Sequence, residues 1–239
     1  MRRSDELWRK AWLALEVVLF FAIKAAELFL PPQPAKCIKF LAILCNTVMA
    51  VRLYLAYGRR AANQWDNLMA LALAVNCAAD VFLTLIGGEA VFLPGFGLFC
   101  TVELIYAVYL RPSRTNLAVR AALLVLILPL AWKLGLLSLT YVLGGWNLTL
   151  LAGNVVSAWL ARRRDENRTA LWFAAGLTLF LMGDISVALE IFLPAGTAAQ
   201  TAATLMVWTV YVPAEALLVL TYDGRIRPAG KESAVRAVL

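Results

Sequence analysis

The sequence predicts an all-α integral membrane protein, a bundle of about eight transmembrane helices with both termini in the cytoplasm. Of its 239 residues, 62% are hydrophobic and 15% are charged, whereas soluble domains are about 45–50% apolar and about 25% charged. The chain therefore has too few polar residues to cover a soluble surface. Long apolar runs and a one-sided distribution of basic residues support the same prediction.

A helix needs about 20 mainly apolar residues to cross the hydrocarbon of a bilayer. Eight runs of this kind follow one another along the chain, at about residues 12–30, 38–57, 67–87, 90–110, 117–133, 136–160, 169–193 and 200–222. Because they leave no stretch for a soluble domain, we expect residues 1–239 to form a single integral membrane domain.

Short connections that contain proline, glycine or arginine separate the runs. In chain order they include residues 31–34, 58–60, 87–88, 111–112, 133–135 and 194–196. The connection at residues 133–135 is very short, so the division between the fifth and sixth runs is the least distinct of the series.

Basic residues distinguish the two sides of the predicted bundle. The termini and alternate connections contain Arg2, Arg3, Arg9, Lys10, Arg59, Arg60, Arg111, Arg114, Arg162, Arg163, Arg164, Arg168, Arg225, Arg227, Lys231 and Arg236. The opposite connections contain only Lys36, Lys39 and Lys133. Basic residues stay cytoplasmic during insertion, so we expect a multi-pass protein of the cell (inner) membrane with both termini inside. This distribution explains the net charge of +7 without a nucleic-acid partner.

The histidine and cysteine contents narrow the possible chemistry. The chain has no histidine, which excludes histidine acid–base catalysis and Ser–His nucleophile pairs. Its four cysteines are isolated from one another and form no C-x-x-C pair, so nothing indicates a disulfide framework or a cysteine metal site. No spacing of carboxylates demands a metal either, and we expect no metal and no cofactor.

Ionisable residues inside the apolar runs are the main functional signal. Such groups are costly at membrane depth and mark functional sites or buried pairs. The chain has an unusual number of them, and carboxylates outnumber cations: Glu16, Lys24, Glu27, Arg52, Asp80, Glu103, Arg120, Asp184, Glu190 and Glu215. Some carboxyl groups therefore lack a cationic partner, and a carboxyl group in that position suits a general acid.

Helical spacing sorts these residues by depth and by face. At about 1.5 Å per residue, Asp80, Asp184 and Lys24 lie at a similar depth, roughly 20 Å from the cytoplasmic ends, whereas Glu103 and Glu215 lie about 10 Å in. Residues three or four apart share a helix face. The pairs that do so are Asn76 with Asp80, Glu103 with Tyr106, and Tyr211 with Glu215.

Two motifs of the sequence are centred on aspartate. The first is Asn-Cys-Ala-Ala-Asp-Val-Phe-Leu at residues 76–83, followed by Phe-Leu-Pro-Gly-Phe-Gly-Leu-Phe at 92–99 and by Tyr106. The second comprises Gly176, Phe180 and Met-Gly-Asp at 182–184, with a closing run from Tyr211 to Leu218. These motifs resemble those of the YhhN family of lysoplasmalogenase-like membrane proteins. Lys36 is similar to the lysine of the family's Lys-Pro pair, and Glu103 stands where the family usually has a histidine.

The resemblance implies a lysoplasmalogenase-like hydrolase, which cleaves the vinyl ether of a lysoplasmalogen to a fatty aldehyde and a glycerophospho-alcohol. Such a site needs one carboxylic acid to protonate carbon and a second carboxylate to orient water. We expect Asp80 and Asp184 to be catalytic in either order, and a polar cavity with a phosphate-binding lysine to hold the lipid substrate. The candidate substrate-binding residues are Lys24, Lys36, Asn76, Glu103, Tyr106, Tyr211 and Glu215.

Two other classes of protein remain open on the sequence. Intramembrane carboxylates also occur in small proton- or cation-coupled transporters. Alternatively, the charges are ion pairs that hold a non-catalytic lipid-binding bundle together.

Overall fold

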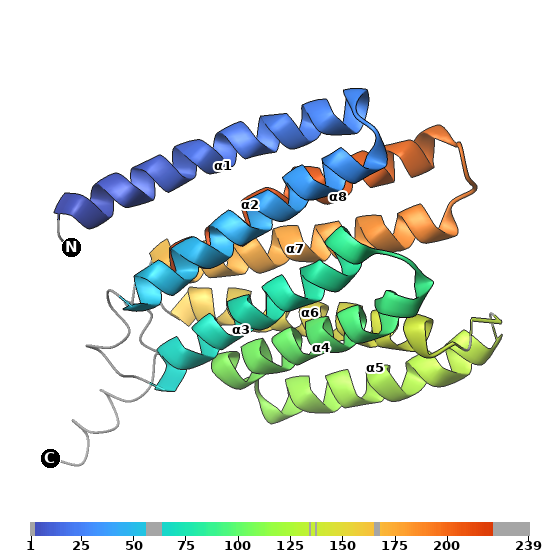
Figure 1. Ribbon diagram of the computed structural model, residues 1–239. Coiled ribbons are helices and arrows are strands. Elements are labelled where there is room, and N and C mark those ends of the chain that lie inside the picture. Colours follow the sequence, from blue (N-terminus) through green and yellow to red (C-terminus); the bar gives the residue numbers. More distant parts are fainter. Residues whose placement is uncertain (1–2, 56–63, 134, 137, 165–167, 222–239) are drawn as a thin grey trace, which may run out of the picture.

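The computed structural model describes residues 3–55, 64–133, 135–136, 138–164 and 168–221, and in these ranges the chain is helical and has no strand (Figure 1). The predicted all-α fold class is confirmed. The α-helices are α1 (Arg3–Phe29), α2 (Pro32–Leu53), α3 (Gln64–Asp80), α4 (Glu89–Leu110), α5 (Arg114–Lys133), α6 (Leu139–Arg164), α7 (Arg168–Phe192) and α8 (Ala198–Thr221). A π-helical segment, η2 (Val81–Ile86), continues α3 directly.

Two helix boundaries differ from the predicted runs. Helix α1 begins at Arg3, well before the apolar run near residue 12, because helical propensity continues through polar residues. Lys10 pairs there with Glu6 one turn earlier, with Nζ 2.8 Å from Oε1. The predicted third run is not one regular helix, because it widens into η2 after Asp80 and ends at Gly87, whose φ of 66° suits glycine.

The connection between α5 and α6 is a tight turn, as expected for so short a separation. Gly135 has a φ of 69° and donates its N–H to the carbonyl of Trp132 at 3.0 Å, while Leu136 donates to Ala131 at 2.8 Å. A glycine in this conformation commonly ends a helix. Two distinct helices therefore follow each other at the place where the apolar runs nearly merge.

Seven of the described helices are long and apolar enough to cross a membrane, namely α2, α3 with η2, and α4 to α8. Helix α1 is the longest, with 27 residues, but its apolar stretch includes Glu16, Lys24 and Glu27. All three carboxyl or amino groups make contacts inside the protein. Whether α1 also crosses, and on which side the termini lie, stays a prediction.

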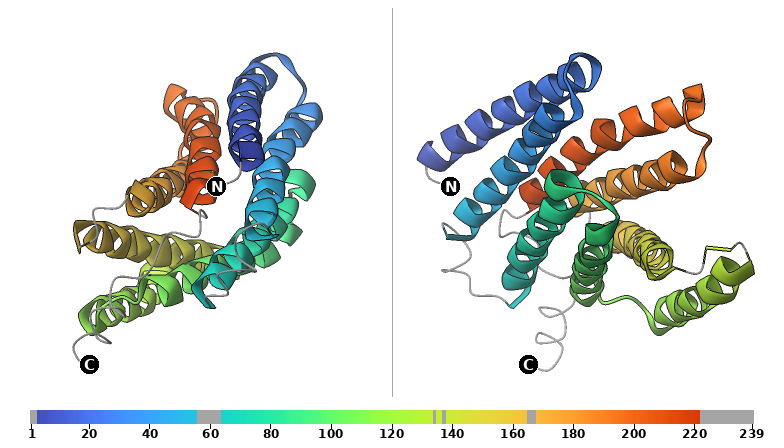
Figure 2. Two further views of the ribbon diagram at one scale, coloured as in Figure 1. Left: turned by 90° about the vertical axis from the view of Figure 1, so that its left-hand side faces the viewer. Right: turned by 45° about the vertical axis from the view of Figure 1, so that its right-hand side comes forward.

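Six helices form a closed ring in which α2, α3, α4, α6, α7 and α8 each contact the next and α8 returns to α2 (Figure 2). Helix α1 lies against α2 and α8. Helix α5 contacts α6 at the periphery, and most of its large apolar side chains are exposed. A lipid environment would cover such an apolar face.

The interior of the ring is partly aromatic and partly polar. Phe173 of α7 packs edge-on against Tyr106 and Tyr109 of α4, with ring centroids 5.6 and 5.4 Å apart. Phe180, two turns further along α7, contacts Phe99 of α4 and Tyr211 of α8. These rings fix α4, α7 and α8 around the buried polar residues that are described next.

Candidate functional site

Asp80 lies in a buried polar cluster between α3 and α8, which we call the α3–α8 cluster and define as Asn76, Asp80, Tyr211 and Glu215. The Tyr211 hydroxyl donates to Asp80 Oδ2 at 2.5 Å. Asn76 Nδ2 faces Asp80 Oδ2 and the Tyr211 hydroxyl, both at 3.3 Å, and Glu215 Oε1 at 2.5 Å. All four side chains are buried. The structure thus joins four of the predicted site residues across the centre of the ring.

Local sequence explains why these side chains converge. Asn76 and Asp80 lie four residues apart on α3, and Tyr211 and Glu215 lie four residues apart on α8, so each pair occupies one helix face. Asp80 is also the last residue before η2, and Thr84 Oγ1 within η2 lies 3.5 Å from Asp80 Oδ1. π-helical turns often occur at functional sites.

Asp184 has a separate polar partner on a different pair of helices. Asn147 of α6 donates from Nδ2 to Asp184 Oδ2 of α7 at 2.7 Å. Asp184 is near enough to influence Asp80 electrostatically. Among the described side chains, the two aspartates share no hydrogen-bond partner. The two aspartates therefore lie at neighbouring positions inside the helix ring, and each accepts a hydrogen bond from a different asparagine.

Glu103 of α4 makes its contacts away from the α3–α8 cluster. Asn154 of α6 donates from Nδ2 to the Glu103 carbonyl at 2.8 Å and to Glu103 Oε2 at 2.7 Å. Both residues are almost completely buried. Glu103 is also within electrostatic range of Asp184, so it forms a third carboxyl position on the same side of the interior.

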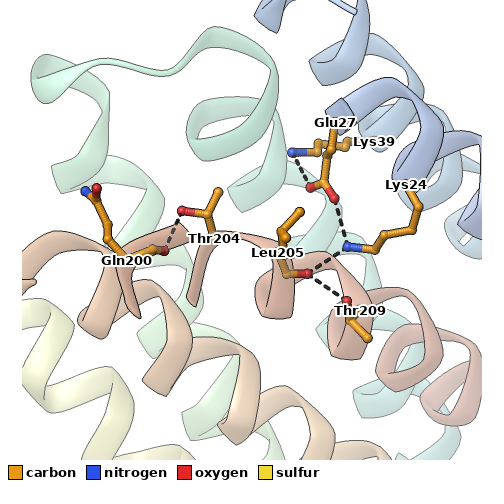
Figure 3. Close-up of polar contacts among 7 residues, drawn as sticks. All are labelled: Lys24, Glu27, Lys39, Gln200, Thr204, Leu205 and Thr209. Carbon is orange, nitrogen blue, oxygen red and sulfur yellow. Dashed lines mark hydrogen bonds and ion pairs between the residues drawn. The ribbon is translucent and has the colours of Figure 1, made fainter. Parts of the chain in front are cut away.

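Lys24 lies in a separate charged group, where the C-terminal part of α1 meets the N-terminal parts of α2 and α8. Its Nζ donates to Glu27 Oε2 at 2.8 Å and to the Leu205 carbonyl of α8 at 2.7 Å. Lys39 of α2 approaches the other Glu27 oxygen at 2.9 Å and lies 4.9 Å from the centroid of the Trp208 ring. Figure 3 shows the two lysines converging on the single glutamate.

Lys36 and Tyr106 lie apart from both aspartates. The Lys36 ammonium lies beside Gly87 at the end of η2. A Cβ atom added at Gly87 would stand 2.8 Å from Lys36 Nζ. The Tyr106 ring belongs to the aromatic core. Among the described contacts, neither Lys24, Lys36 nor Tyr106 bonds to Asp80 or Asp184.

Sequence analysis predicted Asn76 and Tyr211 but missed three asparagines that donate to the other carboxyl groups. Asn147 and Asn154 hold Asp184 and Glu103, and Asn46 of α2 donates to Glu16 of α1 at 3.3 Å. The seven-residue separation of Asn147 and Asn154 places them on one face of α6, two turns apart. That spacing is the signal by which the α6 pair could have been found.

Within the described part of the chain, no group of three or more Cys, Asp or Glu side chains is arranged to hold a metal ion. The interior instead offers carboxyl groups held by amides and by one tyrosine hydroxyl. Such groups can donate and accept protons and can bind a polar or cationic ligand.

A helical ring with lipid-compatible outer surfaces and seven helices long enough to cross a bilayer defines a multi-pass integral membrane protein. The sequence of residues 35–222 matches the YhhN family, and the chain belongs to that family. The matched region begins in α2 and runs to the end of α8, so it includes both aspartates. No curated protein and no solved structure is significantly similar to the chain.

Proposed function

We propose that the protein is a membrane-embedded lipid hydrolase of the lysoplasmalogenase type. The observation that carries this proposal is the position of Asp80 and Asp184, on α3 and α7, within electrostatic range of each other inside the ring. No described cation bonds to either carboxyl group. Two carboxyl groups of this kind can divide the acid and base roles of a hydrolysis.

The proposed reaction needs only protons and water. One aspartic acid gives its proton to the outer carbon of the vinyl ether, which leaves an oxocarbenium-like cation at the carbon bonded to oxygen. The other aspartate accepts a proton from water as the water oxygen adds to that carbon. The resulting hemiacetal loses the glycerophospho-alcohol, and the aldehyde remains. Atoms and charge balance without an oxidant or a covalent intermediate.

The fold suits a substrate with one apolar chain. The outer surfaces of the helices are apolar, so the lipid chain can stay in a hydrocarbon environment while the vinyl ether reaches the polar interior. Lys36 of α2, whose ammonium lies beside Gly87 at the end of η2, supports a phosphate-binding role at that end of the bundle. Lys24 supports such a role less well, because it already bonds to Glu27 and to the Leu205 carbonyl.

The test is aldehyde release by the purified protein in detergent, with a synthetic lysoplasmalogen as substrate. We expect release by the wild type and a loss of at least about 10²-fold in Asp80→Asn and in Asp184→Asn. Glu6→Gln is the control, because Glu6 forms an exposed pair with Lys10. The analogue with a saturated ether should not react, since it has no carbon–carbon double bond to protonate.

Two results would contradict the proposal. One is full turnover by both aspartate variants, which would remove the catalytic assignment. The other is the absence of release by a folded wild-type protein. That second result would favour a coupled transporter or a lipid-binding protein, and proton uptake and lipid binding by reconstituted protein would then separate those two classes.

A further inference from the structure

Lys24, Glu27 and Lys39 form a charged group in which cations outnumber anions. Lys24 Nζ lies 2.8 Å from Glu27 Oε2, and Lys39 Nζ lies 2.9 Å from Glu27 Oε1. Among the described residues, no second carboxylate lies within ion-pair distance of either ammonium group. Two positive charges and one negative charge leave a net charge of +1 where α1, α2 and α8 meet (Figure 3). A partly buried cation of this kind favours an anionic ligand.

The two lysines of this group differ in their hydrogen bonds. Lys24 donates to Glu27 at 2.8 Å and to the Leu205 carbonyl at 2.7 Å. Lys39 Nζ is near Glu27 Oε1, but that oxygen accepts no hydrogen bond from any described residue. An ammonium group has three N–H donors. Lys39 therefore keeps its donors for a ligand, and 15% of its side chain is exposed.

Aromatic rings of α8 connect Lys39 to Asp80. The Lys39 ammonium lies 4.9 Å from the centroid of the Trp208 ring, and the Trp208 and Tyr211 rings are 5.3 Å apart. The Tyr211 hydroxyl in turn donates to Asp80. An ammonium group within about 6 Å of an indole ring is attracted to its face. Two adjacent rings thus have an ammonium group on one side and a proposed catalytic carboxyl group on the other.

A one-chain glycerophospholipid offers chemistry that matches both sides of these rings. Its vinyl ether and its phosphate are joined by the glycerol backbone, so a lipid whose ether reaches Asp80 has its phosphate only a few bonds away. Trp208 precedes Tyr211 by three residues, which is about 4.5 Å along α8. The Lys39 ammonium therefore lies about one helical turn from the level of Tyr211, toward the start of α8.

We propose that Lys39 binds the phosphate of the one-chain lipid, and that Glu27 and Lys24 are positioning residues for it. This inference rests on the proposed function and adds a substrate-binding residue to it. Glu27 holds the Lys39 ammonium beside Trp208, and Lys24 neutralises Glu27, so the charge of Lys39 stays available to the phosphate. Lys36, three residues earlier on α2, lies on the same helix face and is a second cation toward the start of the helix.

The first experiment measures lipid binding without catalysis. The ligands are a one-chain glycerophospholipid with a saturated ether, which has no double bond to protonate, and the same alkylglycerol without phosphate. Calorimetric titration of the wild type in detergent should show about 10-fold tighter binding of the phospholipid. Lys39→Met should bind the two lipids equally, and Lys39→Arg should keep the preference. Lys133→Met is the matched control, because Lys133 is exposed at the end of α5.

Three results of this titration would overturn the proposal. One is equal affinity of the wild type for the two lipids, and another is an unchanged preference in a folded Lys39→Met protein. The third concerns the source of the phosphate, for which inorganic phosphate is the probe. We expect inorganic phosphate to bind much more weakly than the phospholipid, because it has no apolar chain. Equal affinity for inorganic phosphate would make a free anion the ligand.

The charge balance of the group gives a second test. Lys24→Met lowers the net charge from +1 to 0 and should weaken phospholipid binding, although Lys24 is not placed against the phosphate. Adding Glu27→Gln to Lys24→Met returns the net charge to +1 and should restore most of the binding. Adding Glu27→Gln to Lys39→Met also returns the charge to +1, but binding should stay weak. Recovery in both double variants would show that net charge alone attracts the lipid.

Aldehyde release separates this inference from the proposed function. Lys39→Met should raise KM about 10-fold with little change in kcat, because a phosphate contact is the same in the ground and transition states. Asp80→Asn should lower kcat instead. A Lys39→Met protein with a lower kcat and an unchanged KM would contradict the proposed role. If the wild type releases no aldehyde, the hydrolysis fails, while the titrations still decide whether Lys39 binds the lipid phosphate.

Discussion

Four asparagines donate amide hydrogen bonds to carboxyl groups inside the bundle, and each of them makes such a bond between two helices. Asn46 joins α2 to Glu16 of α1, Asn147 joins α6 to Asp184 of α7, and Asn154 joins α6 to Glu103 of α4. Asn76 of α3 donates within its own helix and across to Glu215 of α8. An amide supplies a donor and an acceptor without adding charge. The interior can therefore hold several carboxyl groups with few cations.

Asn147→Leu tests the partner of Asp184 at the residue scale. The change keeps a similar volume and removes the donor to Asp184 Oδ2, so we expect aldehyde release to fall about 10-fold or more, in line with a lost hydrogen bond to a charged or polar group. Asn46→Leu, which removes a hydrogen bond to Glu16 and none to either aspartate, should have a smaller effect on release. Equal losses in the two variants would assign Asn147 a structural role only.

Glu27→Gln tests the charged group of Lys24 and Lys39. Removing the carboxylate leaves two nearby ammonium groups without their shared counter-charge. We expect the free energy of unfolding in detergent to fall by about 1–3 kcal/mol. The exposed pair of Glu6 and Lys10 is the comparison, because Glu6→Gln should leave the free energy of unfolding almost unchanged. A Glu27→Gln protein that melts like the wild type would show that the pair adds no stability.

At the scale of elements, small residues set how closely helices approach. A Cβ atom at Gly176 of α7 would lie 3.1 Å from Leu218 and 3.2 Å from the Ala214 carbonyl of α8. At Gly95 of α4 it would lie 2.4 Å from Leu83 of η2. The first contact brings α7 near to α8, which carries Tyr211 and Glu215. The second brings α4 near to η2, which directly follows Asp80. Close packing of this kind is how membrane helices associate.

Gly176→Val should separate α7 from α8. Overpacking a close contact typically costs about 1–3 kcal/mol, so we expect a lower melting temperature, and reduced aldehyde release as the α3–α8 cluster loses its geometry. Gly144→Ala on α6 is the matched control, because its Cβ atom would meet only the Phe96 ring, at 3.9 Å. The packing argument fails if both variants melt at the same temperature.

At the scale of the whole molecule, the helices alternate in direction and are joined by short connections, so α1 begins and α8 ends at the same end of the bundle (Figure 1). The connection at residues 194–196 lies at the opposite end from residues 111–113. Because helix direction fixes which connections share a side, labelling a few positions tests the whole topology.

Single cysteines at Ser4, Ser113 and Ala195, in a protein without its native cysteines, test the predicted orientation with a membrane-impermeant thiol reagent. We expect Ala195→Cys to react in intact cells, and Ser4→Cys and Ser113→Cys to react only after permeabilisation. Reaction of Ser4→Cys from outside, with Ser113→Cys protected, would mean that α1 does not cross. A reversed pattern at all three positions would reject the predicted cytoplasmic termini.

Composition and periodicity alone determined the helical membrane architecture, because a bilayer requires long apolar helices and leaves few alternatives. They also identified Asp80, Asp184, Glu103 and Glu215 as costly groups that must face inward. They did not identify Asn147 or Asn154, since uncharged polar residues are inexpensive enough in membrane helices to carry no compositional signal, and only the seven-residue spacing of the pair marked it.

Only the tertiary structure decided which side chains meet. Asp80 and Lys24 have a similar predicted depth, yet Asp80 bonds to Tyr211 of α8 while Lys24 bonds to Glu27 and Leu205. Periodicity fixes the face and depth of a residue on its own helix. It does not fix which helices become neighbours or which face turns to which. The ring order of α2, α3, α4, α6, α7 and α8 supplies that information, and with it the contact of Asn154 of α6 with Glu103 of α4.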